Sequence, residues 1–181
     1  VYAVENTPQG VQVFVSRAHP YFISAIFTIE VPEINEGIVE IKGIAREPGI
    51  RTKLAVYSNL KGYDPVGACI GVKGTRVISI MNELNNEKID IIPWDEDPLK
   101  FVANALLPAK VLEVKALPKR TMLVLVLDEE LPLAIGKNGQ NIKLAAKLTG
   151  WQIDVRSAAA PDKAVEGGLA KPDNDNELSE S

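Results

Sequence analysis

Ile70-Gly71-Val72-Lys73-Gly74 and Ile135-Gly136-Lys137-Asn138-Gly139 are two copies of one pattern, Ile-Gly-x-x-Gly, which recurs after 65 residues. The glycine spacing alone is weak evidence, because 13 glycines in 181 residues give about one Gly-x-x-Gly pair by chance. The surroundings of the two copies also agree: a lysine lies inside each, and strand-like runs follow at residues 89–92 and 153–155. Each copy separates a short apolar segment from a helix-like one. The pattern therefore predicts one structural unit that occurs twice.

Both copies predict a tight loop between two helices that can hold a nucleic-acid backbone. Glycine at each end removes the side chains that would keep a phosphodiester chain at a distance, and it permits the dihedral angles of a tight reversal. The helix after the loop directs its free amide groups and the positive end of its dipole to the same place. A glycine-bounded loop of this kind is the phosphate clamp of KH-type RNA-binding modules.

The candidate RNA-contacting residues are the two loops and the polar side chains in the first turns of the helices that follow them. The loop lysines are placed for phosphate contact, the basic residues after the loops can flank the strand, and the amide side chains offer hydrogen bonds to bases or ribose. The alternative for these polar residues is an ordinary solvated helix face. The full set is Gly71, Val72, Lys73, Gly74, Arg76, Gly136, Lys137, Asn138, Gly139, Gln140, Asn141 and Lys143.

The rest of the chain predicts an α+β protein in four parts. Residues 1–16 alternate apolar and polar side chains around the turn at Thr7-Pro8-Gln9-Gly10, which is typical of a β-hairpin. The order helix, strand, strand, helix, loop, helix, strand then occurs twice, and Asp64-Pro65 and Asp97-Pro98 are helix starts. From Ser157 onward the composition is that of a disordered acidic tail. The predicted boundaries are 1–18 for the hairpin, 19–95 and 96–157 for the two repeated units, and 158–181 for the tail.

The composition argues against an enzyme and against a membrane protein. With 46% hydrophobic and 24% charged residues, the chain is typical of a globular cytoplasmic protein, and no apolar run approaches the ~20 residues of a membrane span. Cys69 and His19 are the single cysteine and the single histidine, so we expect neither a disulfide nor a metal site. The phosphate-binding pattern Gly-x-x-x-x-Gly-Lys-Ser/Thr and the dinucleotide pattern Gly-x-Gly-x-x-Gly do not occur. We therefore expect no catalytic residue and no cofactor.

The net charge of −4 is distributed unevenly along the chain. Residues 161–181 contain six acidic and two basic side chains, whereas residues 1–160 contain 18 of each. A neutral body cannot bind polyanions strongly without selectivity, so RNA affinity has to come from local basic surfaces and base contacts. This favours modest, selective binding of single-stranded RNA.

Several stretches resemble one protein family and occur in the same order as in that family. They are Glu30-Val31-Pro32-Glu33-Ile34, Ala45-Arg46-Glu47-Pro48-Gly49, Asp64-Pro65-Val66-Gly67-Ala68-Cys69-Ile70-Gly71, Asn82-Glu83-Leu84 before Glu87-Lys88-Ile89-Asp90-Ile91, and Ala134-Ile135-Gly136-Lys137-Asn138-Gly139-Gln140-Asn141 before Gly150-Trp151. Over about residues 1–156, the chain is similar to the tandem KH region of the NusA family of bacterial transcription elongation and termination factors.

The resemblance implies two type II KH domains, each α-β-β-α-α-β with a three-stranded sheet and helices on one face, packed as one rigid body. It also implies binding of single-stranded RNA and regulation of pausing, termination and antitermination with RNA polymerase. Residues 1–18 resemble the last strands of the OB-fold domain that precedes the KH pair in that family. Contacts with RNA polymerase and with other antitermination factors are expected through the full-length protein.

Three other interpretations compete with a non-catalytic RNA-binding transcription regulator. A ribosome-associated KH protein would share the fold, but such proteins usually carry basic extensions, and this chain has an acidic tail. An RNA-processing enzyme with accessory KH domains would need a catalytic domain that this sequence does not contain. In the third interpretation the second unit only supports the first, but its intact loop favours two working surfaces.

Overall fold

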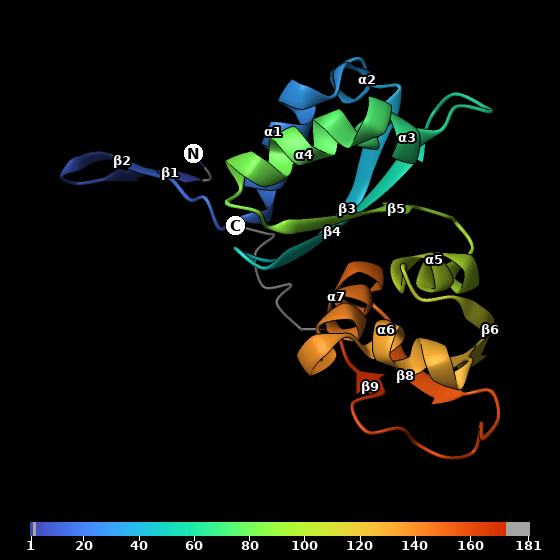
Figure 1. The fold of residues 1–181 in the computed structure, drawn as a ribbon. Helices are drawn as coiled ribbons and strands as arrows, with labels where there is room; N and C mark the ends of the chain where they lie inside the picture. Colours follow the sequence, from blue (N-terminus) through green and yellow to red (C-terminus); the bar gives the residue numbers. More distant parts are fainter. Residues whose placement is uncertain (2, 173–181) are drawn as a thin grey trace.

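The computed structural model of the chain describes residue 1 and residues 3–172. Figure 1 shows a two-stranded hairpin that projects from two larger units. The hairpin consists of β1 (Ala3–Thr7) and β2 (Gly10–Phe14), which pair antiparallel from Ala3 with Phe14 to Thr7 with Gly10. The predicted hairpin is thereby confirmed, while its membership of an OB-fold domain stays a prediction.

The first unit is a three-stranded sheet with helices packed on one face. Its strands lie in the order β3-β4-β5, with β3 antiparallel and β5 parallel to β4. Its core joins Phe27 of the first helix, Leu54 of the central strand and Ile80 of the last helix, all fully buried. The elements are α1 (Pro20–Glu30), α2 (Pro32–Asn35), β3 (Val39–Glu47), β4 (Arg51–Ser58), α3 (Pro65–Ile70), α4 (Thr75–Glu83) and β5 (Lys88–Pro93).

The second unit repeats this arrangement. Its strands lie in the order β6-β7-β8-β9, and again the second strand is antiparallel to the first and parallel to the strand after the helix pair. The repeated α+β order predicted from the sequence is therefore confirmed. The elements are α5 (Pro98–Ala105), β6 (Val111–Leu117), β7 (Thr121–Val126), α6 (Leu131–Ile135), α7 (Gln140–Thr149), β8 (Gln152–Ser157) and β9 (Leu169–Ala170).

The two predicted Asp-Pro helix starts form as expected. The Asp64 side chain accepts a hydrogen bond from the Val66 amide at 3.0 Å, and the Asp97 side chain accepts one from the Leu99 amide at 2.9 Å. Each carboxylate satisfies an amide that has no partner inside the helix, and the proline that follows needs no such partner. Short local signals therefore fix where α3 and α5 begin.

The prediction that residues 158–181 form a disordered tail is wrong for its first fifteen residues. Residues 158–172 are described, and they return to the second sheet as β9, which pairs antiparallel with β8 through Ile153 with Ala170 and Asp154 with Leu169. The second sheet thus has four strands instead of the expected three. The physical reason is that Ala170, only 6% exposed, joins the core of the second unit. The rest of the predicted tail lies outside the described residues.

The open face of the first sheet packs against helices of the second unit. Figure 1 shows the first sheet between its own helices and the pair α5 and α7. Residues 52–56 of β4 are all buried, as expected for a strand covered on both faces. Across the contact, the Lys53 ammonium donates to the carbonyl of Leu107 at 2.8 Å, and the Asn104 amide donates to the carbonyl of Pro93 at 3.0 Å. These contacts hold the two units side by side.

Candidate nucleic-acid interface

The two Gly-x-x-Gly loops have the same backbone conformation. Gly71 and Gly136, which end α3 and α6, have φ/ψ of 75°/171° and 76°/169°. Gly74 and Gly139, which precede α4 and α7, are left-handed, with φ of 78° and 72°. Because such positive φ angles are strained for residues with a side chain, both loops depend on glycine at these positions. The sequence repeat is therefore also a repeat in geometry.

The two glycines of each loop are needed for different reasons. A Cβ on Gly71 would lie 2.7 Å from Cγ of Arg76, and one on Gly136 would lie 2.8 Å from the backbone nitrogen of Asn141. The first glycine therefore lets the loop close against the next helix. A Cβ on Gly74 would meet nothing closer than 3.5 Å. The second glycine is therefore required by its left-handed backbone rather than by a close contact, since a Cβ there would meet the Ile78 side chain at an ordinary contact distance.

The two middle positions of the loops carry different side chains in equivalent places. Val72 corresponds to Lys137, and Val72 is 80% exposed. Lys73 corresponds to Asn138, and these two non-glycine residues share the left-handed conformation, with φ of 52° and 56°. The sequence places one lysine in each loop, but the structure shows that the two lysines do not occupy the same position.

Two of the predicted RNA-contacting residues serve the structure of the loops instead. Asn141 is 1% exposed, and its amide donates to the carbonyls of Leu133 and Ala134 in α6 at 3.1 and 3.2 Å. The prediction that Asn141 contacts RNA is therefore wrong, because its polar atoms are buried beneath the loop. Arg76 makes the equivalent link in the first unit and donates to the carbonyl of Ala68 at 2.6 Å.

Arg76 is also neutralised by a carboxylate. Its guanidinium lies 2.9 Å from Glu33, and the Tyr63 hydroxyl donates to the same carboxylate at 3.2 Å. Burial acts to raise the pKa of Glu33, but hydrogen bonds from its own backbone and from Arg76 lower it overall. Glu33 is therefore an anion at neutral pH, and Arg76 adds little positive charge to the first loop. Its predicted role as a flanking phosphate contact is not supported by this geometry.

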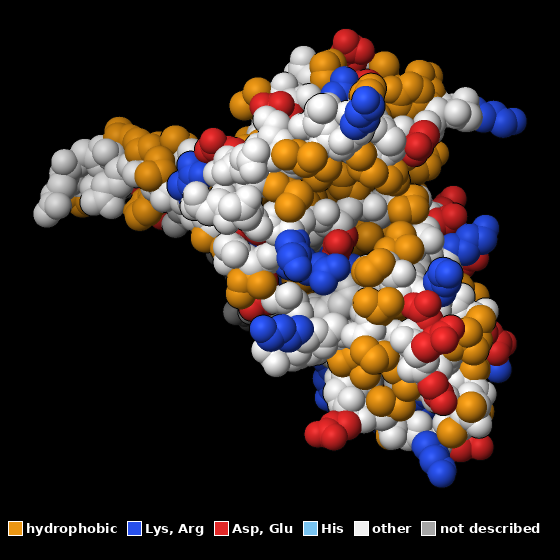
Figure 2. Space-filling view, in the orientation of Figure 1, with side chains coloured by type: hydrophobic (Ala, Val, Ile, Leu, Met, Phe, Trp, Pro, Cys, Tyr) orange, Lys and Arg blue, Asp and Glu red, His pale blue; other side chains and the backbone are white. Residues whose placement is uncertain are grey.

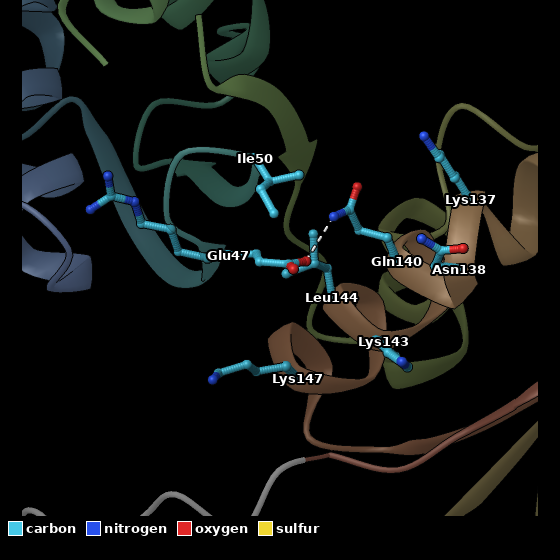
Figure 3. A pocket seen from close by; sticks show the side chains of 9 residues that line it. Glu47, Ile50, Lys137, Asn138, Gln140, Lys143, Leu144 and Lys147 are labelled. Atoms are coloured by element: carbon cyan, nitrogen blue, oxygen red, sulfur yellow. Dashed lines mark hydrogen bonds between the residues drawn. The ribbon is translucent and has the colours of Figure 1, made fainter. Parts of the chain in front are cut away.

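A cleft of about 510 Å³ lies beside the second loop, between the two units. Figure 3 shows side chains from α7 and its loop on one wall and from the β3–β4 turn on the other. The Gln140 amide donates to the Glu47 carboxylate across the cleft at 2.7 Å. The lining residues are Arg46, Glu47, Ile50, Lys137, Asn138, Gln140, Lys143, Leu144 and Lys147. Four of the predicted residues are thus brought together here.

Lysines supply the positive charge of this cleft. Lys137, Lys143 and Lys147 are exposed, and Lys137 and Lys143 have no ion pair with any other described residue. Lys147 was missed in the sequence, although its spacing of four residues from Lys143 places both on one helix face. Figure 2 shows Lys and Arg side chains near the junction of the two units. The second loop is therefore more basic than the first, where Lys73 stands alone.

Arg46 also lines the cleft but is held by a buried carboxylate. Its guanidinium lies 2.9 Å from Glu87, which also accepts from the Thr52 hydroxyl at 2.5 Å and the Gly49 amide at 2.8 Å. Burial acts to raise the pKa of Glu87, but the hydrogen bonds from Arg46, Thr52 and Gly49 lower it overall. The carboxylate is therefore charged at neutral pH and cancels the charge of Arg46. The positive charge of the cleft therefore comes from its lysines.

The described residues provide neither a metal-binding cluster nor a reactive cysteine. They include no group of three or more His, Cys, Asp or Glu side chains that could hold a metal ion. Burial raises the pKa of the Cys69 thiol to about 12, so this cysteine is not a nucleophile at neutral pH. The candidate interface presents lysine and side-chain amide groups.

Two units of this topology, each with a glycine-bounded loop between its last two helices, define a protein with tandem type II KH domains. Models of the NusA-like first KH domain and the NusA-like second KH domain match residues 17–94 and 98–163. The crystal structure of APE1850 superposes on 76% of the chain and 97% of its own length with a TM-score of 0.57. At 20% identity it supports the fold alone.

Several bacterial proteins with sequences similar to this chain share the same name. The transcription termination/antitermination protein NusA is 52% identical over 167 residues in Halalkalibacterium halodurans, 54% over 155 residues in Bacillus subtilis and 55% over 148 residues in Mycobacterium bovis. These matches cover 92%, 85% and 81% of the chain but only 43%, 42% and 43% of the relatives. The chain belongs to the NusA family and carries its two KH domains.

Proposed function

We propose that the chain binds single-stranded RNA through its two Gly-x-x-Gly loops, as the RNA-contacting part of a transcription termination and antitermination factor. The observation that supports this most is the closely matching backbone of the two loops, each with a left-handed second glycine directly before a helix. Neither α4 nor α7 has a side-chain cap at its first residues. The amides of Thr75 and Gln140, the first residues of these helices, donate to the carbonyls of Val72 and Lys137 inside the loops, so the helices attract phosphate mainly through the positive ends of their dipoles.

The charge distribution supports modest affinity rather than strong general binding. The only unpaired cations at the loops among the described residues are lysines: Lys73 at the first, and Lys137 and Lys143 at the second. A few phosphate contacts give an affinity that falls with rising salt, with a slope of about −0.7 per neutralised phosphate for single strands. Selectivity then has to come from base contacts, which the amides of Asn138 and Gln140 can supply.

The test replaces each loop centre with two carboxylates. Val72→Asp with Lys73→Asp, and separately Lys137→Asp with Asn138→Asp, should each weaken binding of a single-stranded RNA at least about tenfold by repelling the cradled phosphate. These positions are exposed, so the circular dichroism spectrum should not change. Affinity is measured by fluorescence anisotropy.

The matched control is Leu60→Asp with Lys61→Asp in the connection between β4 and α3. It makes the same chemical change as Val72→Asp with Lys73→Asp, from an exposed apolar residue and a lysine to two carboxylates. Its affinity for RNA should stay within about threefold of the parent chain. If both loop variants bind like this control while remaining folded, neither loop is an RNA site.

We further propose a cytoplasmic protein that works with RNA polymerase and other antitermination factors through a longer chain. The relatives are more than twice as long as their matched segments, and no described helix is long and apolar enough to cross a membrane. Crosslinking in a cell extract should recover RNA together with RNA polymerase. Recovery of ribosomal RNA without polymerase would favour the alternative of a ribosome- or RNA-processing-associated KH protein.

A further inference from the structure

The segment of residues 165–170, here called the return segment, occupies the outer edge of β8. The Val155 amide donates to the Gly168 carbonyl at 2.7 Å, and Leu169 and Ala170 continue the antiparallel pairing. A strand edge carries unpaired amides and carbonyls that invite another strand or a polar ligand. In the second unit, the return segment already uses part of this edge.

The return segment also lies next to the second loop. A Cβ on Gly167 would stand 3.5 Å from Cγ2 of Ile135, the residue directly before Gly136. On its other side, a Cβ on Gly168 would be 2.5 Å from the carbonyl oxygen of Val155 in β8. The two glycines let the segment run between the end of α6 and the edge of β8. A nucleic-acid strand that continued from the second loop toward the edge of β8 would contact the return segment.

The first unit has a corresponding strand edge that no described strand covers. There, β5 is the strand that follows the helix pair, and no strand among the described residues pairs with its outer edge. The helix before the loop contacts this edge strand in both units, α3 with β5 and α6 with β8. The two units therefore share their loops but differ in whether the neighbouring strand edge is open.

We propose that the return segment competes with RNA for the edge of β8. This inference rests on the proposed RNA binding at the second loop. With the segment docked, the second unit holds RNA by phosphates at its loop, and hydrogen bonding of bases to a strand edge is confined to β5. When the segment is released, the edge of β8 can also form hydrogen bonds with bases. The docked contact is small, since β9 has two residues and Leu169 is 55% exposed, so an RNA strand can displace it.

The experiment measures RNA binding and the docked contact together. Gly168→Val places side-chain atoms against the Val155 carbonyl and should undock the segment, so that hydrogen exchange of the Val155 amide becomes faster. Affinity for a single-stranded RNA of about 12 nucleotides should then rise roughly fivefold. The matched control, Leu169→Ser, changes an exposed neighbour and should leave exchange and affinity unchanged.

The parent chain provides a second measurement that does not depend on any variant. Under competition, saturating RNA should accelerate exchange of the Leu169 and Ala170 amides, because the released segment loses its partner strand while RNA itself covers the edge of β8. If RNA binds through the loops while the exchange of the Leu169 and Ala170 amides stays unchanged, or if undocking by Gly168→Val leaves affinity unchanged, the competition does not exist. If the parent chain binds no single-stranded RNA at all, the proposed function itself fails, and this result is separate from the other two.

Discussion

At the scale of single residues, the two loops adopt the same backbone conformation with different side chains. The third loop position is left-handed in both units, and Asn138 is a residue type that tolerates this conformation, whereas Lys73 is not. Lys73 is exposed and has no ion pair with a described residue. Its left-handed backbone and its lack of an ion pair among the described residues agree with the proposed contact between this lysine and phosphate.

Changing the first loop into a copy of the second tests whether the lysine position matters. Val72→Lys with Lys73→Asn keeps the net charge and places asparagine in the left-handed position. Because Val72 is 80% exposed and asparagine is less strained, unfolding in urea should show equal or higher stability, by about 0.5 kcal/mol. RNA affinity should stay within about twofold. A tenfold loss of affinity at full stability would instead mean that the phosphate site is specific for Lys73.

The sequence predicted which residues form the loops but not what every neighbour does. The glycines and lysines are recognisable because their role depends on the local backbone. Arg76 and Asn141 differ, since each hydrogen-bonds carbonyls of the preceding helix, and such partners are known only when two helices are placed in space. A polar side chain in the first turn after a loop has the same sequence signature whether it faces RNA or pins the loop.

At the scale of secondary-structure elements, one buried carboxylate joins three parts of the first unit. Glu87 stands before β5 and binds Arg46 of β3, Thr52 of β4 and the amide of Gly49 in the turn between them. These partners satisfy the carboxylate although it is fully buried. The network holds the β3–β4 turn against the start of β5, and this turn forms one wall of the cleft. The shape of the cleft therefore depends on Glu87.

Glu87→Gln should destabilise the first unit by about 3 kcal/mol at neutral pH, because it leaves Arg46 buried without its counter-charge. The pKa of Glu87 is lowered in the folded chain, so its stabilisation is present above the unfolded pKa of about 4.3 and is lost as the pH falls through the folded value. The difference in urea midpoint between parent and variant should therefore shrink below about pH 4.

Glu83→Gln is the matched control for this change. Glu83 pairs with Arg17 at 3.2 Å, but the two side chains are 58% and 62% exposed. Exposed pairs contribute little, so this variant should stay within about 0.5 kcal/mol of the parent at every pH. If Glu87→Gln and Glu83→Gln lost the same stability, the burial of Glu87 would not increase its contribution to the stability of the fold.

The order of the helices and strands could be predicted because it depends on local hydrophobic periodicity. The strand β9 could not be predicted in this way. Helices and strands of the repeated units are bounded by Asp-Pro, Gly and alternating apolar residues that act over a few positions. Leu169 and Ala170 form a strand only because they pair with the edge of β8 and Ala170 packs into the core of the second unit. Around them, Ala, Pro, Gly and charged residues have the composition of disorder. A two-residue strand has no periodicity to read.

At the scale of the whole molecule, the junction of the two units contains a buried cation. Lys53 of β4 is fully buried, pairs with Asp90 at 3.2 Å and donates to the Leu107 carbonyl of the second unit at 2.8 Å. Burial lowers the pKa of Lys53 from 10.5 to about 8, although Asp90 acts to raise it. Asp90 also binds Arg51 through both carboxylate oxygens, at 2.7 and 3.0 Å. The junction therefore holds a lysine whose charge is costly to keep.

Stability should accordingly rise with pH in the window set by Lys53. Between the folded pKa of about 8 and the unfolded value near 10.5, the unfolded chain binds more protons, so unfolding becomes less favourable as the pH increases. The urea midpoint of the parent chain should increase from about pH 7.5 to about pH 9.5, corresponding to roughly 1–2 kcal/mol. Lys53→Met keeps the length of the side chain and leaves Asp90 paired with Arg51, so its midpoint should stay nearly constant over the same range. If the urea midpoint of Lys53→Met rose with pH as steeply as that of the parent, other groups would cause the rise. Burial of the charged Lys53 would then not destabilise the folded chain.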